Sequence, residues 1–283
     1  MKVNLFIVGA PKAGTTSLYH YLNQHPDILM SAVKEPDYFS KDDLRSQKLY
    51  YDSKSIHSLS SYHDLFDSSD SKFYGEASVS YLYYPKVAER IKEYNSDSKI
   101  VIMLRDPIER AFSHFLMDSR LGFTSEDFET IFDQKSGLFF QQYFELGNYS
   151  SQIIRYINVF GHSNIHFIWH SDFKSDTLFE VKRILEFLDL DSEVNLNLKI
   201  RHNKFRMPRN NLIRKIYSFS ILRKLLNLFL PKHLSKKFKN ILFDNQNKPN
   251  LDKNLRKRII SYYSDEISKL ENMFNKDLST WRK

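Results

Sequence analysis

The sequence predicts an α/β fold with a mainly parallel central sheet flanked by helices. Short apolar runs alternate along the chain with segments of helical periodicity, the pattern that such a sheet requires. The first apolar run, Val3 to Val8, leads through a short turn into a helical segment, as in a P-loop-like strand–loop–helix phosphate site. No Pro/Gly-rich linker interrupts the 283 residues, so residues 1–283 are expected to form one domain.

The same patterns place the other elements in order. Buried strands are expected at Val3–Val8, Phe73–Glu76, Lys99–Leu104 and Asn164–Trp169. Helices are expected at Thr15–Gln24, Tyr62–Phe66, Pro85–Tyr94, from Asp106 onward, and at Tyr149–Phe160, Leu178–Leu188 and Leu251–Phe274. Pro85 is expected at the first position of its helix, and Asp106 with Pro107 supplies an N-cap and a first-turn proline. The polar stretch from Ser40 to Ser71 is expected to be an excursion with one short helix, and residues 122–147 carry no motif.

The composition limits the classes of function. There is no cysteine, which excludes disulfides, thiolate catalysis and Cys-based metal sites. The net charge of +8 suits an anionic partner, but nucleic acid, anionic lipid, a polyanionic glycan and a nucleotide donor all fit. No apolar run approaches the roughly 20 residues of a membrane-spanning helix. We therefore expect a cytoplasmic protein.

The first motif is Gly9-Ala10-Pro11-Lys12-Ala13-Gly14-Thr15-Thr16-Ser17, between a predicted strand and a predicted helix. This junction points backbone N–H groups and the positive helix end at one spot, which makes an anion site. Lys12 adds a point charge, and Thr15, Thr16 and Ser17 add hydroxyl donors. The loop is not a Walker A motif, because Thr15 stands where that motif needs lysine.

The second motif is Arg105-Asp106-Pro107-Ile108-Glu109-Arg110-Ala111-Phe112-Ser113, again at a strand end before a helix. Arg105 can present its planar fork of donors to a phosphate, and Ser113 can donate from the helix. Taken alone, this segment is also an ordinary capped helix start. It follows the first motif by about 90 residues.

The two motifs in this order resemble those of the sulfotransferases that use 3′-phosphoadenosine 5′-phosphosulfate (PAPS). The resemblance is closest to the glycosaminoglycan (heparan sulfate)-type and bacterial carbohydrate enzymes. It implies that Lys12, Ala13, Gly14, Thr15, Thr16 and Ser17 bind the 5′-phosphosulfate. It also implies that Arg105 and Ser113 bind the 3′-phosphate, with adenosine 3′,5′-bisphosphate as the product and no metal.

A carboxylate, Glu76, ends the second predicted strand among small and apolar residues, where its pKa can rise and it can serve as a base. An ordinary exposed or paired glutamate is the alternative. The resemblance favours the base, because related enzymes carry a similar Glu-x-Ser/Thr-x-x-Tyr segment. Glu76 is therefore expected to take the acceptor proton, while Lys12 stabilises charge on the leaving phosphate oxygen.

Two further segments are weaker candidates. Lys34-Glu35-Pro36-Asp37-Tyr38-Phe39 resembles a segment near the acceptor in the same enzymes, so Lys34 and Glu35 are expected to bind substrate. In Arg201–Arg209 the usual basic loop pattern of the family is absent, and Lys204 and Arg206 are the candidates for nucleotide contact.

The expected activity is transfer of a sulfuryl group to a hydroxyl or amine of an acceptor, with a carbohydrate favoured by the resemblance. One rival is a P-loop kinase or GTPase. The other is a basic binder of nucleic acid or membrane, supported by thirteen Lys or Arg and no Asp or Glu between Val194 and Phe243. The basic C-terminal part, residues 194–283, is expected to be helical. Residues 212–240 could then add peripheral membrane contact, while no nucleic acid partner is expected.

Overall fold

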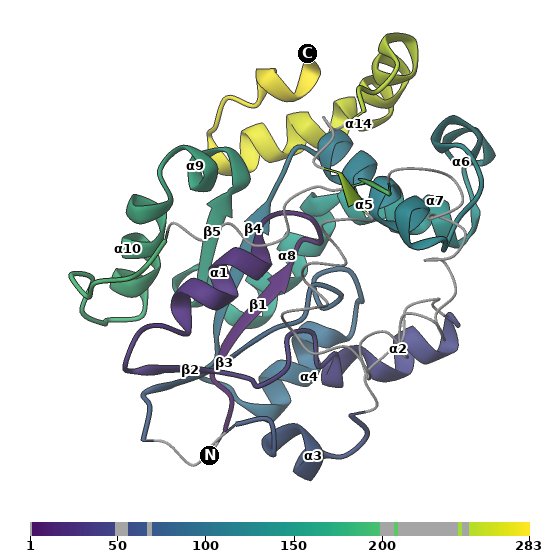
Figure 1. Cartoon of the computed structure of the whole chain (residues 1–283). Helices are drawn as coiled ribbons and strands as arrows, with labels where there is room; N and C mark the ends of the chain where they lie inside the picture. Colours follow the sequence, from purple (N-terminus) through teal and green to yellow (C-terminus); the bar gives the residue numbers. More distant parts are fainter. Residues whose placement is uncertain (1, 49–55, 67–69, 199–206, 209–242, 245–248) are drawn as a thin grey trace.

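The central sheet has five parallel strands in the order β2-β3-β1-β4-β5 (Figure 1). The computed structural model describes residues 2–48, 56–66, 70–198, 207–208, 243–244 and 249–283. The strands are β1 Leu5–Gly9, β2 Ile28–Met30, β3 Phe73–Ala77, β4 Lys99–Leu104 and β5 Ile165–Trp169. Every residue of β1 is buried, as expected for a central strand covered on both faces. A separate antiparallel pair joins β6 Met207–Pro208 to β7 Phe243–Asp244.

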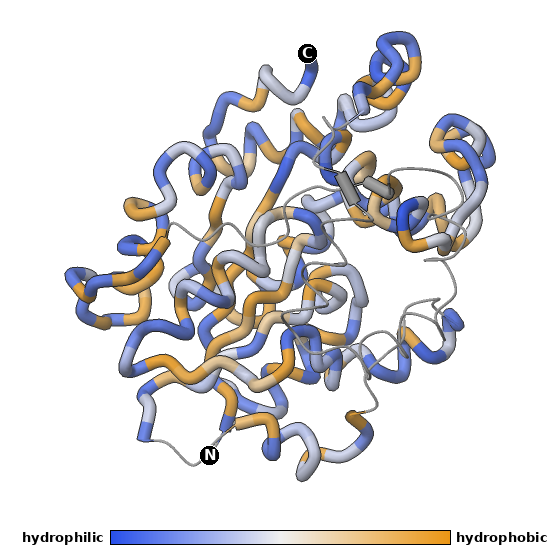
Figure 2. Tube along the Cα trace, viewed as in Figure 1, coloured by the Kyte–Doolittle hydropathy of each residue, from blue (hydrophilic) through white to orange (hydrophobic). Residues whose placement is uncertain are grey.

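Helices surround the sheet, whose strands include several of the most hydrophobic stretches (Figure 2). Those in the first half of the chain are α1 Thr15–Leu22, α2 Lys41–Ser46, α3 Leu59–His63, α4 Val87–Tyr94, α5 Pro107–Leu121, α6 Phe128–Gln134 and α7 Gly137–Tyr143. They are followed by α8 Tyr149–Phe160, α9 His170–Ser175, α10 Thr177–Phe187 and α14 Lys253–Phe274. Helix α1 contacts α10, and α4 contacts α8.

The connections between strands determine where a ligand can bind. From β1 the chain runs through α1 towards β2 and β3, and from β3 it returns through α4 to β4 on the other side of β1. Because such crossovers are right-handed, α1 and α4 lie on opposite faces of the sheet. The chain therefore leaves the adjacent strands β1 and β4 in opposite directions. Ligands of open α/β sheets bind at such a switch point, outside the carboxyl ends of the strands.

The sequence predictions for the sheet and most helices are confirmed. The four expected strands are present, and α8 has the expected bounds. Asp106 caps α5 by accepting hydrogen bonds from the N–H groups of Ile108 and Glu109 at 2.9 and 3.3 Å. The helix expected from Pro85 instead begins at Val87, with Lys86 as its N-cap.

Some elements were not anticipated. Strand β2 is three residues long, too short for an apolar pattern to identify. The stretch from Ser40 to Ser71 contains α2 as well as the expected short helix α3. Residues 122–147, which carry no motif, form α6 and α7, and buried aromatic residues such as Phe128, Phe140 and Tyr143 pack these helices into the core.

The predictions for the basic C-terminal part are only partly covered by the structure. Its last helix, expected at Leu251–Phe274, is confirmed as α14. Lys204, Arg206 and all of residues 212–240 lie outside the described residues, so the expected nucleotide contact and membrane contact stay predictions. Within the described part of the chain, no helix is both long and apolar enough to cross a membrane. The cytoplasmic location also stays a prediction.

Candidate active site

The loop between β1 and α1 lies at the switch point and lines a cavity of about 1260 Å³. Lys12 and Gly14 both have positive φ values, 66° and 102°. Glycine suits position 14 for two reasons. Its φ value would strain any residue with a Cβ, and that Cβ would also lie 3.3 Å from Met103 Cε on β4. The left-handed residue before Thr15 turns the chain sharply into α1, whose N-terminus is the positive end of the helix dipole.

Five of the six residues predicted to bind the 5′-phosphosulfate line this cavity: Lys12, Gly14, Thr15, Thr16 and Ser17. The side chain of the sixth, Ala13, is fully buried in the core instead. Its methyl group therefore packs the loop, and only its backbone could face a ligand. The lining thus combines three hydroxyl side chains with an ammonium group at a helix N-terminus, a set of donors suited to an anion.

The ammonium group of Lys12 is held inside the molecule. Its Nζ lies 3.2 Å from Met117 Sδ, on the inner side of α5. Burial, followed by the positive charge of Arg120, lowers the pKa of Lys12 to about 8. A weakly solvated cation of this kind gains stability when an anion arrives, because the anion restores the interactions that burial removed.

The structure brings the second motif against the first. Arg105, directly after β4, donates from Nη1 to the carbonyl oxygen of Lys12 at 2.8 Å. Its Nη2 lies 3.7 Å from Glu109 Oε2, and its own carbonyl accepts the hydroxyl of Tyr149 at 2.9 Å. Arg105 and Ser113 both line the same cavity as Lys12. Two positive side chains from loops 93 residues apart therefore face one space.

The segment after β2 supplies another wall of the cavity, including Lys34, Glu35 and Asp37. Lys34 Nζ and Glu35 Oε1 form an ion pair at 2.5 Å, with the Glu35 side chain 45% exposed and that of Lys34 16% exposed. The N–H of Glu35 donates to the carbonyl of Ala77 at 3.0 Å, which fastens this segment to the end of β3. Glu35 is thus a carboxylate that an acceptor in the cavity can reach.

Glu76 lies elsewhere than its predicted role requires. Its side chain is fully buried and is not among the cavity-lining residues. Oε1 accepts hydrogen bonds from the hydroxyls of Tyr62 at 2.5 Å and Tyr81 at 3.0 Å, and Oε2 accepts one from Ser78 at 2.7 Å. Burial raises the pKa of Glu76 to about 7, as the sequence argument expected of this carboxylate, but the group has no path to an acceptor.

Sequence reasoning missed a basic wall of the cavity on and around α2. Lys41, Leu44, Arg45 and Lys48 all line the cavity. Their spacing is that of one helix face, and this was the signal in the sequence that could have identified them. The described lining residues include seven Lys or Arg and only two carboxylates, so the cavity as a whole attracts anions.

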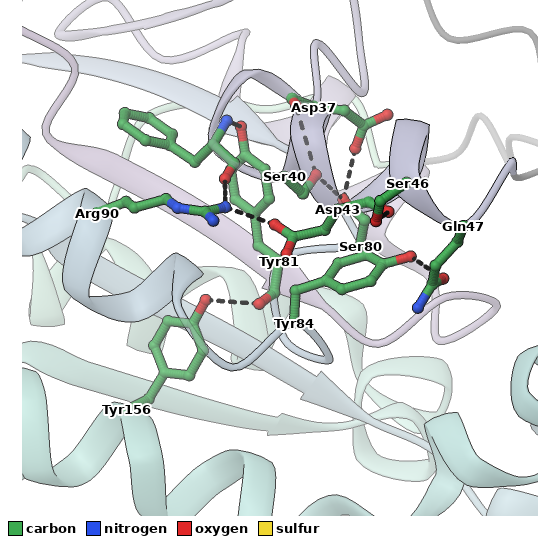
Figure 3. A network of polar contacts seen from close by, with 11 residues as sticks. Asp37, Ser40, Asp43, Ser46, Gln47, Ser80, Tyr81, Tyr84, Arg90 and Tyr156 are labelled. Carbon is green, nitrogen blue, oxygen red and sulfur yellow. Dashed lines mark hydrogen bonds and ion pairs between the residues drawn. The ribbon is translucent and has the colours of Figure 1, made fainter.

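The opposite side of α2 is fixed to the core (Figure 3). Arg90 on α4 pairs with Asp43 at 2.5 Å, and Tyr84 donates to Gln47 Oε1 at 2.7 Å. Arg90 also donates to the carbonyl of Phe39 at 2.6 Å. These bonds keep the basic face of α2 directed into the cavity.

His170 is an uncharged imidazole among the residues that line the cavity. Burial, with the charges of Arg105 and Lys174, lowers the pKa of His170 to about 4, so this side chain carries no charge at neutral pH. In the part of the chain that the structure describes, no three His, Asp or Glu side chains come together as metal ligands would.

The fold and the cationic and hydroxyl side chains at its switch point define a class of proteins, and comparison with known proteins identifies it. The model of the sulfotransferase domain family matches residues 2–273, and the chain belongs to that family. A sulfotransferase from Alicyclobacillus acidocaldarius, solved as a crystal structure, superposes with a TM-score of 0.74 and 27% identity, covering 100% of both chains. A sulfotransferase domain of the curacin biosynthetic pathway has a TM-score of 0.51 and 18% identity over 93% of this chain and 98% of its own, and shares the fold.

Two relatives are named for carbohydrate or heparan sulfate acceptors. Carbohydrate sulfotransferase 15 of Mus musculus is 22% identical over an alignment of 244 positions, which covers 66% of this chain and 44% of that protein. Heparan sulfate glucosamine 3-O-sulfotransferase 3A1 of the same organism is 25% identical over 190 residues, or 65% of this chain and 45% of that protein. The chain thus spans less than half the length of these relatives.

Proposed function

We propose that the protein transfers a sulfuryl group from PAPS to a hydroxyl or amine of a carbohydrate. The observation that carries this proposal is the meeting of the two anion-binding loops at one switch point, where Arg105 contacts the Lys12 carbonyl. Two separate cationic positions suit a nucleotide with a phosphate at each end of its ribose. Family membership and the two carbohydrate sulfotransferases among the relatives support the reaction and the acceptor class.

The donor-binding roles keep the assignment that the sequence resemblance implies, and the shared cavity supports it. Lys12, the hydroxyls of Thr15 and Thr16 and the N-terminus of α1 bind the 5′-phosphosulfate, while Arg105 and Ser113 bind the 3′-phosphate. As the sulfur–oxygen bond to the 5′-phosphate breaks, its electron pair moves to the phosphate oxygen, and Lys12 stabilises that charge. Positioning and charge stabilisation provide most of the catalysis, as in phosphoryl transfer.

We place the general base at Glu35 instead of Glu76. A general base must come within hydrogen-bond reach of the proton that it removes. Glu35 lines the cavity and is 45% exposed, whereas the carboxylate of Glu76 is enclosed by three hydroxyl donors. In this mechanism Glu35 takes the acceptor proton as the new sulfur–oxygen or sulfur–nitrogen bond forms. Lys34, paired with Glu35, contacts the oxygens of the moving sulfuryl group or of the acceptor.

The basic wall formed by Lys41, Arg45 and Lys48 favours an acceptor that already carries negative charge. Lys41 and Arg45 project from one face of α2, Lys48 follows just after the helix ends, and all three line the cavity. Two of them also contact His57, with Lys41 Nζ 2.8 Å from its carbonyl and Arg45 Nη2 3.1 Å from Nδ1. An oligosaccharide with carboxylate or sulfate groups would therefore bind better than a neutral one, and salt would weaken that preference.

A sulfate-transfer assay tests the proposed function. The protein is incubated with ³⁵S-labelled PAPS and a panel of neutral oligosaccharides, anionic oligosaccharides and phenols, with a Lys12→Ala variant as control. We expect label in the carbohydrates, most in the anionic ones, and little with the variant. Labelling of phenols alone would refute the carbohydrate acceptor. Absence of transfer together with hydrolysis of magnesium ATP would instead support the kinase-like alternative.

A further inference from the structure

The carboxylate of Glu76 is fully buried, and the proposed mechanism gives it no role. Burying an ionisable carboxyl group is costly unless hydrogen bonds compensate for the lost water. Here the three donors come from three places: Tyr62 on α3, Ser78 at the end of β3 and Tyr81 in the connection to α4. Both carboxylate oxygens thus accept hydrogen bonds within the core.

Each of these three donors also contacts the segment 34–39. Ser78 Oγ accepts the N–H of Asp37 at 3.0 Å, and the hydroxyl of Tyr81 accepts the N–H of Phe39 at 3.1 Å. The ring of Tyr62 stacks on Tyr38, with 4.8 Å between ring centroids and 16° between planes. Glu76 is therefore linked to segment 34–39 through the side chains of Ser78, Tyr81 and Tyr62.

The direction of these hydrogen bonds depends on the charge of Glu76. A hydroxyl has one proton to donate, and an ionised carboxylate can only accept. Ser78 and Tyr81 therefore both point their protons at Glu76 and leave oxygen lone pairs for the N–H groups of Asp37 and Phe39. A protonated or amide side chain at position 76 would place a donor opposite one of these hydroxyls, whose own proton would then turn away from Glu76 and crowd the backbone N–H that its oxygen accepts.

The segment needs such support because its backbone is strained. Glu35 and Asp37 have φ values of 59° and 53°, in the left-handed region that non-glycine residues seldom occupy. Such conformations persist only where the surroundings over-determine them. Ser80 adds a further tie, donating to Asp37 Oδ1 at 2.6 Å and lying 2.8 Å from Ser40 Oγ (Figure 3).

From this geometry we infer that Glu76 is a positioning residue: its carboxylate orients Ser78, Tyr81 and Tyr62 so that segment 34–39 presents Lys34 and Glu35 to the acceptor. The inference rests on the proposed function in that it gives Glu35 the role of base. It predicts that Glu76 acts on turnover through the segment and has no direct part in donor binding, because its hydrogen bonds come from Tyr62, Ser78 and Tyr81, which are not among the proposed donor-binding residues.

Because these hydrogen bonds depend on the charge of Glu76, turnover should depend on pH. The ionisable groups facing Glu76 from the surrounding elements are Asp37, Tyr62, Tyr81, Tyr94 and Tyr156. Burial raises the pKa of Tyr62, Tyr81 and Tyr156 well above 10, so these hydroxyls keep their protons. Protonation of Glu76, whose pKa is about 7, should therefore loosen the segment and reduce turnover as the pH falls through neutrality.

The test compares Glu76→Gln and Ser78→Ala with a matched control, Tyr156→Phe. Tyr156 donates to the carbonyl of Tyr81 at 2.9 Å, so the control also removes one buried hydroxyl but leaves the contacts to segment 34–39 intact. Turnover with saturating PAPS should fall by about 10²-fold in Glu76→Gln, the cost of misplacing a reacting group. It should fall less in Ser78→Ala and change little in Tyr156→Phe. The affinity for adenosine 3′,5′-bisphosphate should stay within about twofold in all three.

Two further readouts separate positioning from other roles. The loss of turnover below pH 7 should disappear in Glu76→Gln, which cannot ionise. Hydrogen exchange at the amides of Asp37 and Phe39 should accelerate in Glu76→Gln and Ser78→Ala but not in the control. This measurement needs no turnover, so it tests the inference even if the wild-type protein transfers no sulfuryl group, an outcome that would refute the proposed function alone.

Three results would overturn the inference. The first is unchanged exchange at both amides in a folded Glu76→Gln protein. The second is full turnover by Ser78→Ala with none by Glu76→Gln, which would mean that Glu76 acts other than through the segment. The third is an equal loss of donor affinity and turnover in Glu76→Gln. If this variant does not fold, Ser78→Ala and Tyr62→Phe, which keep the charge, carry the same exchange test.

Discussion

Binding of the product nucleotide should take up a proton at Lys12. Burial and the nearby Arg120 lower the pKa of this lysine to about 8 in the empty cavity. A phosphate beside the ammonium group would favour its charged form and raise the pKa well above 8. At pH 8 the free protein then carries the proton on about half of its molecules, so binding takes up about half a proton per site, against about 0.1 at pH 7 and about 0.9 at pH 9.

Calorimetry measures this uptake directly. Adenosine 3′,5′-bisphosphate is titrated into the protein at pH 8 in two buffers with different ionisation enthalpies, and the difference in observed heat gives the protons exchanged. The phosphates of the ligand contribute little, because their second pKa is about 6. His170 has a pKa of about 4, so it is uncharged at pH 8 and contributes no proton to this uptake. Affinity should fall as the pH rises above 8, by no more than about tenfold per pH unit.

The matched control is Lys12→Arg, because a guanidinium stays charged throughout this range. It should bind the nucleotide without proton uptake. The reasoning would be refuted if the heat in the wild-type protein did not depend on the buffer at pH 8 and 9, or if Lys12→Arg took up as many protons as the wild type.

Three other variants test the remaining parts of the site. Arg105→Ala should weaken binding of adenosine 3′,5′-bisphosphate by about 10–100-fold, as expected for a lost charged hydrogen bond, and leave AMP affinity unchanged in calorimetry. An equal loss for both ligands would contradict its 3′-phosphate role. Glu35→Gln should reduce transfer by about 10²–10⁴-fold with unchanged product affinity, and near-normal turnover when chemistry limits the rate would move the base elsewhere. Since the pKa of Glu76 rises from 4.5 to about 7 on folding, wild-type stability should decline between these pH values. In urea unfolding, Glu76→Gln should therefore gain about 3 kcal/mol relative to wild type from pH 4.5 to pH 7.5, and a gain in the opposite direction would contradict the raised pKa.

Much of the fold and the two loops that line the cavity could be predicted because their signals are local. A strand such as Lys99–Leu104 is a continuous apolar run, and Asp106 with Pro107 marks the start of the next helix within three residues. The strand order could not be predicted, because pairing depends on contacts between residues such as Leu5, Gly75 and Lys99 that lie far apart in sequence. Strand β2 was too short to show any periodicity.

The acceptor side was harder to predict because its residues act through tertiary contacts. Helix α2 has six residues, and its polar sequence suggests an exposed loop. Its position depends on Arg90, which pairs with Asp43 from another element and which no local pattern connects to it. The basic face of Lys41, Arg45 and Lys48 becomes a cavity wall only after that pairing is known.

The sequence predicts Glu76 as the base and we propose Glu35 instead, and this difference has a physical cause. The sequence shows that Glu76 ends a strand among small and apolar residues, which correctly implies burial and a raised pKa. It does not show whether an acceptor can reach the group, and here the same burial that raises the pKa also closes the route. Glu35 lies in a segment whose backbone is fastened to the end of β3, while its carboxylate is 45% exposed and lines the cavity. A carboxylate sealed in the core can hold such a segment in a strained shape, and a carboxylate on the segment can meet the acceptor, so the two proposed roles require opposite degrees of burial.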